Sequence, residues 1–409
     1  MLLKYRVKNF CSFKDEVVFS MKPGKVISRF EDNVVYINQR LKILKSAVIE
    51  GENAGGKTSF MRSLDYLKYL FESDSYPRMV KSLAYNYNMH DIQFFEITVL
   101  ASNNIIYTYS LKLDYYSPIE ESLYIRTASQ DENCNKKIFY SRRIEVNNLD
   151  KNDDKNIRLL FDIDIEDKYI KKELKHIVEE RFSDEQTNTG LIIKYLSLIG
   201  VDIILPFVDW MSNSLTLNLP QDHSFNFYKQ MKKDEEDILI IKSDKFLDIF
   251  RLVDSSIIKI EVNEEDPFQK TIIIRKTEDG KDFRIELRYE SSGTREFFAW
   301  SIQIWKVIYK NVILFADEID RVLNSVLSEK IISLIQGTDH KGQFIFSTHN
   351  VLHLNTRIYM KEQLYFISKQ KDTLSSELYS LADFEDYRYD KADVYDLYLK
   401  GILGGVPND

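Results

Sequence analysis

The sequence predicts a mixed α/β protein built around a parallel sheet with helices on both faces. Three near-continuous apolar segments have the composition of strands that are buried on both sides: 43–50, 311–316 and 343–347. Segments with apolar residues at three- and four-residue steps alternate with them. The first of these follows the first buried strand and places its apolar face at Phe60, Leu64, Leu67 and Phe71. Buried strands that alternate with amphipathic helices indicate a sheet covered on both faces.

The remaining elements divide the chain into two lobes and an insertion. Alternating or apolar stretches predict further strands: 3–8, 16–20, 93–100, 104–113, 136–140, 270–276 and 282–289. Helical spacing and composition predict further helices: 168–200, 244–254, 296–310 and 322–336. A polar, charged run at 148–156 indicates a loop, and the composition shifts there. We therefore expect an N-terminal lobe at 1–147, a mostly helical insertion at 148–265 and a C-terminal lobe at 266–409.

Composition limits the classes of function. The net charge is −8, from 56 basic and 64 acidic residues, so the whole chain has no general attraction to nucleic acid, although a local basic patch is compatible with it. Cys11 and Cys134 are the two cysteines, too few for a disulfide framework, which favours a reducing compartment. No apolar run reaches 18 residues, and the N-terminus does not read as a signal peptide. We expect a soluble cytoplasmic protein without a membrane partner.

A phosphate-binding loop follows the first buried strand. The segment GENAGGKT matches G-x-x-x-x-G-K-[ST], and it opens a predicted helix, which is where the mechanism requires it. The backbone amides of such a loop surround phosphates, and the helix N-terminus adds a favourable field. Lys57 is expected to contact the β and γ phosphates, and the Thr58 hydroxyl to ligate Mg²⁺. The predicted ATP-binding residues are Gly51, Glu52, Asn53, Ala54, Gly55, Gly56, Lys57, Thr58 and Ser59.

Two later strands end in polar side chains. The strand 312–316 leads directly into Asp317 and Glu318, which are expected to hold Mg²⁺ and to act as the general base for the attacking water. The strand 343–347 leads to His349, at the end of a strand where ligands bind in open α/β sheets. His349 is expected to sense the γ-phosphate or to position the water. His349 and His353 have a zinc-like spacing, but no glutamate follows His349 and no third ligand is evident, so we reject a metal site there.

The segment ESSGT at 290–294 precedes the helix predicted at 296–310. One interpretation is a helix cap, since serine and threonine favour that position. The other is a second anion site made by the Ser291 hydroxyl and the backbone amides at a helix start. Asp320 has a similar ambiguity, because its position also suits the cap of the helix 322–336.

The order NFxSFxD, GxNxxGKT, ESSGT, DEID, STHN resembles the AAA-type branch of the SMC, RecF and OLD group of ABC ATPases. It is especially similar to the compact ATPases of bacterial abortive-infection and anti-phage systems, such as RloA-like, AbiL-like and PARIS-type subunits. The resemblance covers residues 1–70 and 285–355. It implies an ABC-type P-loop ATPase head that uses ATP and Mg²⁺. It also implies a head-to-tail dimer in which Ser291 and Gly293 contact the γ-phosphate held by the other subunit, with Asp320 at the interface.

Departures from the family pattern concern single positions. The signature reads ESSGT rather than LSGGQ, Cys11 replaces a common basic residue, and Asn324 replaces a frequent histidine. Gln93 is a weak candidate for the Q-loop glutamine. The long coiled coil of SMC proteins is missing, and 60 residues after His349, with an acidic group at Asp383, Glu385 and Asp386, are too few for the TOPRIM nuclease domain of OLD proteins.

The resemblance implies an ATP-driven switch in defence. We expect the ATPase or sensor subunit of an anti-phage system that controls a separately encoded effector, which could be a TOPRIM-type nuclease. Two alternatives stay open: a RecF-like ATPase of DNA repair that binds nucleic acid, and a nucleotide-gated scaffold without turnover.

Overall fold

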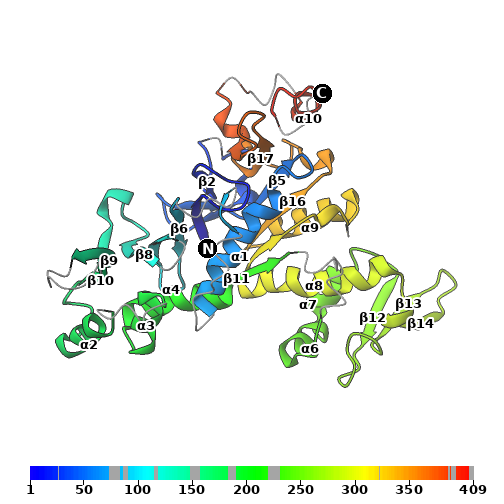
Figure 1. The fold of residues 1–409 in the computed structure, drawn as a ribbon. Coiled ribbons are helices and arrows are strands. Elements are labelled where there is room, and N and C mark those ends of the chain that lie inside the picture. The colour runs from blue at the N-terminus through cyan, green and yellow to red at the C-terminus, as the bar shows by residue number, and fades with distance from the viewer. Residues whose placement is uncertain are drawn as a thin grey trace.

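The computed structural model describes residues 1–25, 27–72, 83–85, 91–114, 118–147, 157–182, 190–219, 231–321, 323–385, 387 and 393–404. Within these ranges, four sheets of seven, six, three and two strands are formed (Figure 1). None of the described helices is long and apolar enough to cross a membrane.

The six-stranded sheet forms the centre of the molecule. Its strand order is β11 (Leu215–Asn218), β15 (Ile313–Ala316), β16 (Gln343–Thr348), β5 (Ser46–Gly51), β17 (Leu364–Lys369) and β18 (Ser376–Ser380). The first five strands are parallel, and β18 runs antiparallel to β17. Every residue of β5, β15 and β16 is buried, as their apolar composition predicts. Because the strands are parallel, the segments that leave β5, β15 and β16 meet at one edge of the sheet.

Helices and a second sheet cover the two faces of this central sheet. Along β15, Ile313 and Phe315 belong to one apolar core, whereas Leu314 and Ala316 belong to another. The first core also contains α1 (Lys57–Glu72), and the second contains α8 (Ser292–Lys310) and α9 (Ser325–Gly337). The mixed α/β class with a sheet covered on both faces is therefore confirmed.

The seven-stranded sheet shares the first core with α1. Its order is β10 (Ile157–Ile165), β9 (Lys136–Asn147), β8 (Pro118–Thr127), β7 (Ile105–Leu113), β6 (Gln93–Leu100), β1 (Leu2–Lys8) and β2 (Val17–Ser20). All six pairings are antiparallel. The alternate residues Tyr5, Ile97, Tyr107 and Tyr109 point into the core, which leaves the opposite face of the sheet to polar side chains. The short hairpin of β3 (Val34–Tyr36) and β4 (Lys42–Leu44) leads into β5.

The middle of the chain contributes both helices and strands. Its helices are α2 (Lys172–Phe182), α3 (Ile192–Leu198), α4 (Leu205–Asp209), a π-helix (Trp210–Ser214), α6 (Glu235–Ile241) and α7 (Asp244–Phe250). The range 148–265 also supplies β10 to the antiparallel sheet and β11 to the central sheet, so it is interleaved with both lobes. The expected loop at 148–156 lies outside the described residues, and the division into two lobes and an insertion stays a proposal.

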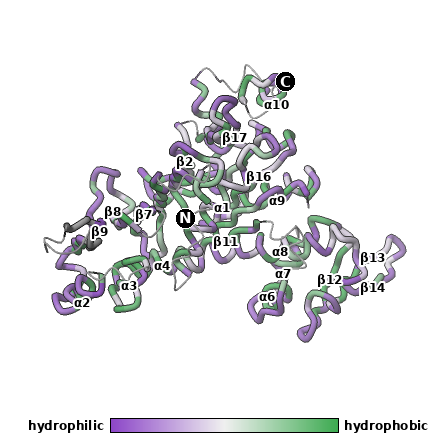
Figure 2. Tube along the Cα trace, in the orientation of Figure 1, coloured by the Kyte–Doolittle hydropathy of each residue, from purple (hydrophilic) through white to green (hydrophobic). Residues whose placement is uncertain are grey.

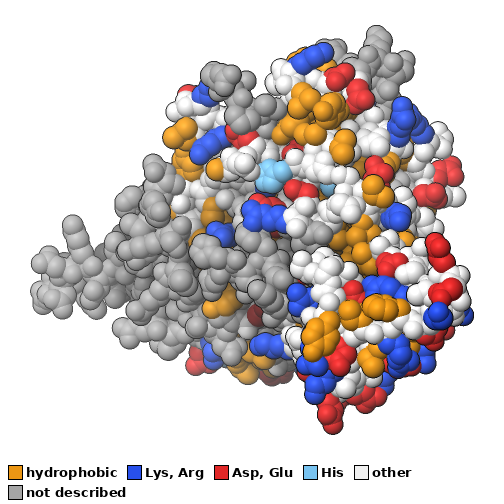
Figure 3. Space-filling view, turned by 90° about the vertical axis from the view of Figure 1, so that its right-hand side faces the viewer, with side chains coloured by type: hydrophobic (Ala, Val, Ile, Leu, Met, Phe, Trp, Pro, Cys, Tyr) orange, Lys and Arg blue, Asp and Glu red, His pale blue; other side chains and the backbone are white. Residues whose placement is uncertain are grey.

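The periphery is more hydrophilic than the centre. The three-stranded sheet consists of β12 (Ile257–Glu261), β13 (Ile272–Lys276) and β14 (Asp282–Glu286), and the last helix is α10 (Val394–Leu399). In Figure 2 the tube is mostly purple in α2 and in the β13–β14 arm and greener around β16. On the face seen in Figure 3, acidic and basic side chains are intermixed around the β12–β14 sheet, so the electrostatic potential there is not uniformly positive or negative.

Candidate nucleotide-binding and catalytic site

The phosphate-binding loop joins β5 to α1 under tight packing. Gly56 has φ +125°, and a Cβ built on it would lie 2.5 Å from Ser376 Oγ and 2.7 Å from Ser12 Oγ. Ser376 Oγ donates to the Gly55 carbonyl, and the Ser376 amide donates to the Ser12 carbonyl at 2.7 Å. The turn after β1 and the start of β18 therefore hold the loop from outside. Ser12 Oγ is itself buried and has no hydrogen-bond partner in the described structure.

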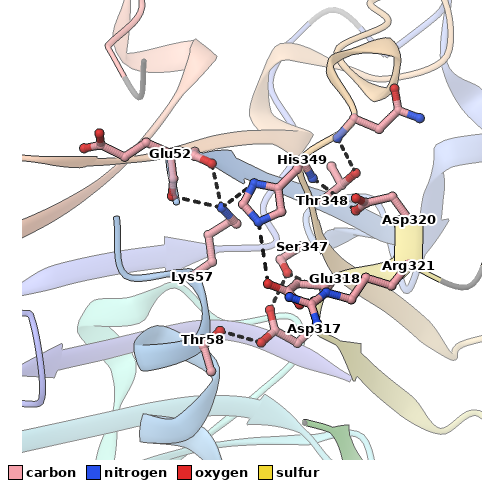
Figure 4. Close-up of polar contacts among 12 residues, drawn as sticks. Glu52, Lys57, Thr58, Asp317, Glu318, Asp320, Arg321, Ser347, Thr348 and His349 are labelled. Atoms are coloured by element: carbon pink, nitrogen blue, oxygen red, sulfur yellow. Dashed lines mark hydrogen bonds and ion pairs between the residues drawn. The ribbon is translucent and has the colours of Figure 1, made fainter. Parts of the chain in front are cut away.

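Lys57 lies over this loop at the start of α1. Its Nζ donates to the carbonyls of Gly51 at 2.5 Å and Glu52 at 3.2 Å, and it is 3.3 Å from His349 Nδ1 (Figure 4). Burial lowers the pKa of Lys57, and the nearby carboxylates, with Glu50 the strongest, oppose that shift. The site thus contains a buried cation that already contacts oxygen atoms, as phosphate binding requires.

Thr58, Asp317 and Ser347 form a chain of hydrogen bonds between α1, β15 and β16. Thr58 Oγ1 donates to Asp317 Oδ2 at 2.6 Å, and Ser347 Oγ donates to Asp317 Oδ1 (Figure 4). A hydroxyl and a carboxylate so close together are oxygen ligands of the kind that Mg²⁺ takes alongside phosphate oxygens. These two residues therefore fit the predicted metal site.

Glu318 has an unusual backbone. Its φ is +50°, in the left-handed region, and its amide donates to Ser347 Oγ at 2.8 Å. Such strain persists where neighbouring contacts fix the conformation. Its carboxylate forms an ion pair with Arg321, and its Oε1 lies 3.6 Å from His349 Nε2 (Figure 4).

His349 connects the lysine and the carboxylate. Because a charged lysine only donates, His349 Nδ1 accepts from Lys57, which leaves the ring proton on Nε2, the atom that faces Glu318. The His349 amide donates to Asp320 Oδ1 at 3.1 Å. The helix α9 starts at Ser325 with Asn324 as its side-chain cap, so Asp320 is not the cap of that helix.

His353 belongs to the core rather than to this site. It is buried, and its two ring nitrogens lie 2.7 Å from Ser328 Oγ and 2.9 Å from Thr348 Oγ1. The described residues contain no group of three or more His, Cys, Asp and Glu that could hold a metal ion.

The signature segment 290–294 lies in another part of the structure, at the start of α8. Ser291 caps α8, since its Oγ accepts from the Thr294 amide at 3.1 Å. The residue before it, Glu290, is anchored by Arg275 of β13, which also contacts Asp254. Ser291 and Gly293 are exposed, and Figure 1 shows the start of α8 beside β14, away from the loop between β5 and α1. The structure therefore confirms that Ser291 caps α8, and its contact with a second subunit stays a prediction.

Several residues at the site were missed by sequence reasoning. Ser347 and Arg321 contact the two carboxylates, but isolated serines and arginines carry no motif signal. Glu50, the last residue before the loop, is 1% exposed, and burial raises its pKa to about 8, against the lowering effect of Lys57. Only its place before the first glycine of the loop could have drawn attention to it.

The remaining candidates lie outside this cluster. Gln93 is buried, and its Nε2 donates to the Asn9 carbonyl at 3.0 Å, so it supports the turn after β1. Cys11 lies in that turn with φ +49°. Asp383 accepts from the Ser380 amide at 2.8 Å, Glu385 is exposed, and Asp386 lies outside the described residues.

Comparisons with known proteins agree with the expected family. The model of a protein family described as "AAA domain, putative AbiEii toxin, Type IV TA system" matches residues 46–355, more than half of the chain, and this range runs from β5 past His349. The match confirms the expected AAA-type resemblance to ATPases of abortive-infection systems. No curated protein matches the sequence.

Similar solved structures are heads of SMC proteins. The SMC head domain from Thermotoga maritima is 14% identical, with 93% of this chain and 98% of that chain covered and a TM-score of 0.43. A structure of the SmcHead bound to the C-winged helix domain of ScpA is 13% identical, with 93% and 97% covered and a TM-score of 0.46.

Proposed function

This chain belongs to the AAA domain family described as a putative AbiEii toxin of a type IV TA system, and on that premise we propose that it binds ATP with Mg²⁺ and hydrolyses it. One observation carries the proposal. Lys57, Thr58, Asp317, Glu318 and His349 come from three segments far apart in the sequence and meet in one network of contacts at the edge of the central sheet.

Lys57 and the loop amides bind the phosphates in this proposal. Arriving phosphate oxygens replace the Gly51 and Glu52 carbonyls as acceptors of the Lys57 ammonium. Thr58 and Asp317 hold Mg²⁺, which neutralises phosphate charge when it is bound. Ser347 keeps the Asp317 carboxylate oriented toward Thr58.

Glu318 and His349 act on the attacking water and the γ-phosphate. Glu318 accepts a proton from the water as general base, and Ser347 and the strained backbone fix the direction of its side chain. His349 Nε2 carries a proton toward Glu318, so this ring can donate a hydrogen bond to the water or to a γ-phosphate oxygen.

The first test is Glu318→Gln. We expect normal ATP binding and hydrolysis at least about a hundredfold slower, the scale of a lost general base. Equilibrium binding of ATP and steady-state phosphate release measure the two effects. Glu329→Gln, at an exposed position of α9, is the matched control and should keep its activity. Full turnover by Glu318→Gln contradicts the assignment of the base.

At a finer level, we propose that this ATPase is the switch subunit of an anti-phage or abortive-infection system that controls a separately encoded effector. The family description supports this role. Phage plating on cells that carry this gene with its neighbours tests it: protection or toxicity should depend on Glu318. Equal plating with and without the genes argues against a defence role. The cytoplasmic location, the RecF-like alternative and the scaffold alternative stay untested expectations.

A further inference from the structure

A cavity of about 420 Å³ lies on the polar face of the antiparallel sheet, away from the phosphate loop. One side is formed by β1, β2, β6, β7 and β8, and the others by the turn and strand at 40–43 that lead toward β5 and by the segment 128–135 after β8. The phosphate loop follows the opposite end of β5, a strand of six residues that spans about 20 Å. The cavity is therefore separate from the site described above. Its volume is within the roughly 300–1,000 Å³ of pockets for small molecules.

A row of polar side chains crosses the floor of this cavity. Strand register places Lys4 opposite both Ser20 and Thr98, and Thr98 opposite Thr108. Thr98 and Thr108 are joined through their hydroxyls at 3.2 Å. Arg126 lies on β8 diagonally from Thr108, because it pairs with Ile106, two positions before Thr108 on β7. The floor thus presents hydroxyl and cationic donors side by side.

Basic side chains outnumber acidic ones around the cavity, although the whole chain carries net charge −8. The five cations that line it are Lys4, Lys22, Arg40, Lys42 and Arg126. In the part of the chain that the structure describes, none of the five forms an ion pair. The three acids are Glu96, Asp131 and Glu132, and Glu96 is already paired with Arg6. Asp131 and Glu132 attract Arg126, and Lys42 Nζ lies 5.1 Å from the centre of the Tyr36 ring. Five cations against three acids still leave the cavity with an excess of positive charge.

Arg126 provides the second, independent observation. The residue is only 8% exposed, and its buried Nε has no hydrogen-bond partner in the described part of the chain. Among the residues that the structure describes, its guanidinium makes one hydrogen bond, a long one from Nη1 to the Gln130 carbonyl at 3.5 Å. A buried guanidinium with an unmade hydrogen bond is costly unless a ligand completes it. Arginine is also the side chain whose fork of donors best matches phosphate.

We propose that this cavity binds the phosphate group of a small, nucleotide-sized ligand, at a second site separate from the phosphate loop. Arg126 supplies the charge that a phosphate neutralises, and Lys4 and Lys42, which line other parts of the cavity, add to its positive charge. The hydroxyls of Ser20, Thr98 and Thr108 lie on strands farther along the sheet and supply neutral donors for other parts of the ligand. Such a site allows a soluble phosphorylated compound to act on the protein independently of the ATP that the loop binds.

Ligand binding is measured with the Lys57→Ala variant, because this change removes the lysine of the phosphate loop and so weakens binding at that first site. Titration calorimetry at low salt uses four nucleoside monophosphates, inorganic phosphate and a single-stranded oligonucleotide as probes. We expect a mononucleotide or phosphate to bind, and the affinity to fall by at least about tenfold when Arg126→Gln or Lys42→Gln is added. Binding should also weaken as salt concentration rises.

Lys57→Ala with Lys8→Gln is the matched control. Lys8 is exposed on the same strand and the same face as Lys4 but does not line the cavity, so affinity should be unchanged. Lys42→Gln keeps the test valid if the buried Arg126 variant fails to fold. No binding of any probe overturns the proposal, and so does binding that neither added change weakens. Binding of the oligonucleotide alone also overturns it, in favour of a nucleic-acid surface.

Discussion

At the scale of single residues, Ser347 connects the two carboxylates of the site. Its hydroxyl donates to Asp317 and accepts from the amide of Glu318, whose backbone is held at φ +50°. We expect Ser347→Ala to slow ATP hydrolysis by at least about tenfold, equivalent to about 1.4 kcal/mol of lost positioning. ATP binding should stay within a fewfold of the original, because Lys57 and Thr58 are unchanged. Phosphate release and equilibrium binding separate these effects, and the exposed Ser333→Ala is the control. Unchanged turnover by Ser347→Ala shows that this positioning is dispensable.

Glu50 makes stability depend on pH. Its pKa in the folded protein is about 8, above the ordinary value of 4.5, so the folded state holds a proton that the unfolded state has lost between these limits. Its contribution is therefore fully present below about pH 4.5 and is lost as pH rises through about 8. Between pH 7 and 8, the free energy of unfolding should fall by up to about 1.4 kcal/mol per pH unit because of this group.

Urea denaturation without nucleotide measures this dependence. Glu50→Gln should flatten the curve between pH 7 and 8, while Glu31→Gln, at an exposed position, should leave it unchanged. The window begins at pH 7 because burial also raises the pKa of Glu121, to about 7. Parallel curves for wild type and Glu50→Gln contradict the shift.

The sequence predicted the residues of the site better than their partners. The motifs predicted Lys57, Thr58, Asp317, Glu318 and His349 because a phosphate loop and strand-end carboxylates have fixed spacing along the chain, and the structure brings these five side chains together. Ser347 lies in the strand predicted at 343–347, but its contact with Asp317 depends on the pairing of β15 with β16. Arg321 contacts Glu318 only three residues before it, and Glu50 owes its raised pKa to burial in the central sheet, so neither carries a motif of its own.

At the scale of elements, a buried carboxylate joins β8 to α3. Glu121 accepts from the amides of Ile192 at 2.7 Å and Ile193 at 3.0 Å, and from the Tyr109 hydroxyl at 3.1 Å. The residue that precedes α3, Leu191, has no side chain that can cap it. Glu121 of β8 therefore accepts hydrogen bonds from the first amides of α3, at the N-terminal end of the helix, where a negative charge is favourable.

Glu121→Ala should lower the free energy of unfolding by at least about 3 kcal/mol, because three buried donors lose their acceptor at roughly 1–3 kcal/mol each. Chemical denaturation measures this change. The neighbouring Glu120, half-buried and paired with Lys112, is the matched control, and Glu120→Ala should cost at most about 1 kcal/mol. Similar losses from the two substitutions contradict the bridging role of Glu121.

Some elements were predictable and others were not, for physical reasons. The strands β5, β15 and β16 are buried on both faces, so their apolar composition alone marks them. The strand β11 has four residues and reaches the central sheet from a largely helical segment, beside β15, which lies nearly a hundred positions later in the chain. Local pattern contains no information on such long-range pairing, so the interleaving of the middle segment was not foreseen.

At the scale of the whole molecule, the signature and the phosphate loop are separate surfaces of one chain. Ser291 and Gly293 are exposed at the start of α8, and Arg275 fixes the preceding Glu290. The Thr294 amide is already used by the Ser291 cap, so any anion site there relies on the Ser291 hydroxyl and the remaining first amides of α8. If hydrolysis needs both surfaces around one γ-phosphate, two subunits must pair head to tail about a twofold axis.

Ser291→Arg separates a cap from a contact between subunits. As a cap alone, the residue contributes on the order of 1 kcal/mol of stability, and its loss should leave ATP hydrolysis nearly intact. If it contacts the γ-phosphate of a second subunit, a bulky cation blocks closure and abolishes hydrolysis, while ATP binding to the monomer persists through Lys57 and Thr58. Ser243→Arg is the matched control, since Ser243 caps α7 in the same way, through the Phe246 amide at 3.2 Å.

Mixing two inactive variants then tests catalysis between subunits. In a mixed dimer of Ser291→Arg and Lys57→Ala, one composite site carries both lesions and the other combines an intact loop with an intact signature. Because that second site is complete, we expect part of the ATPase activity to return on mixing, and light scattering should show ATP-dependent association of Glu318→Gln. If Ser291→Arg is as active as Ser243→Arg, the segment at 290–294 is only a helix cap. The protein would then be a P-loop ATPase that hydrolyses ATP without the signature of a second subunit.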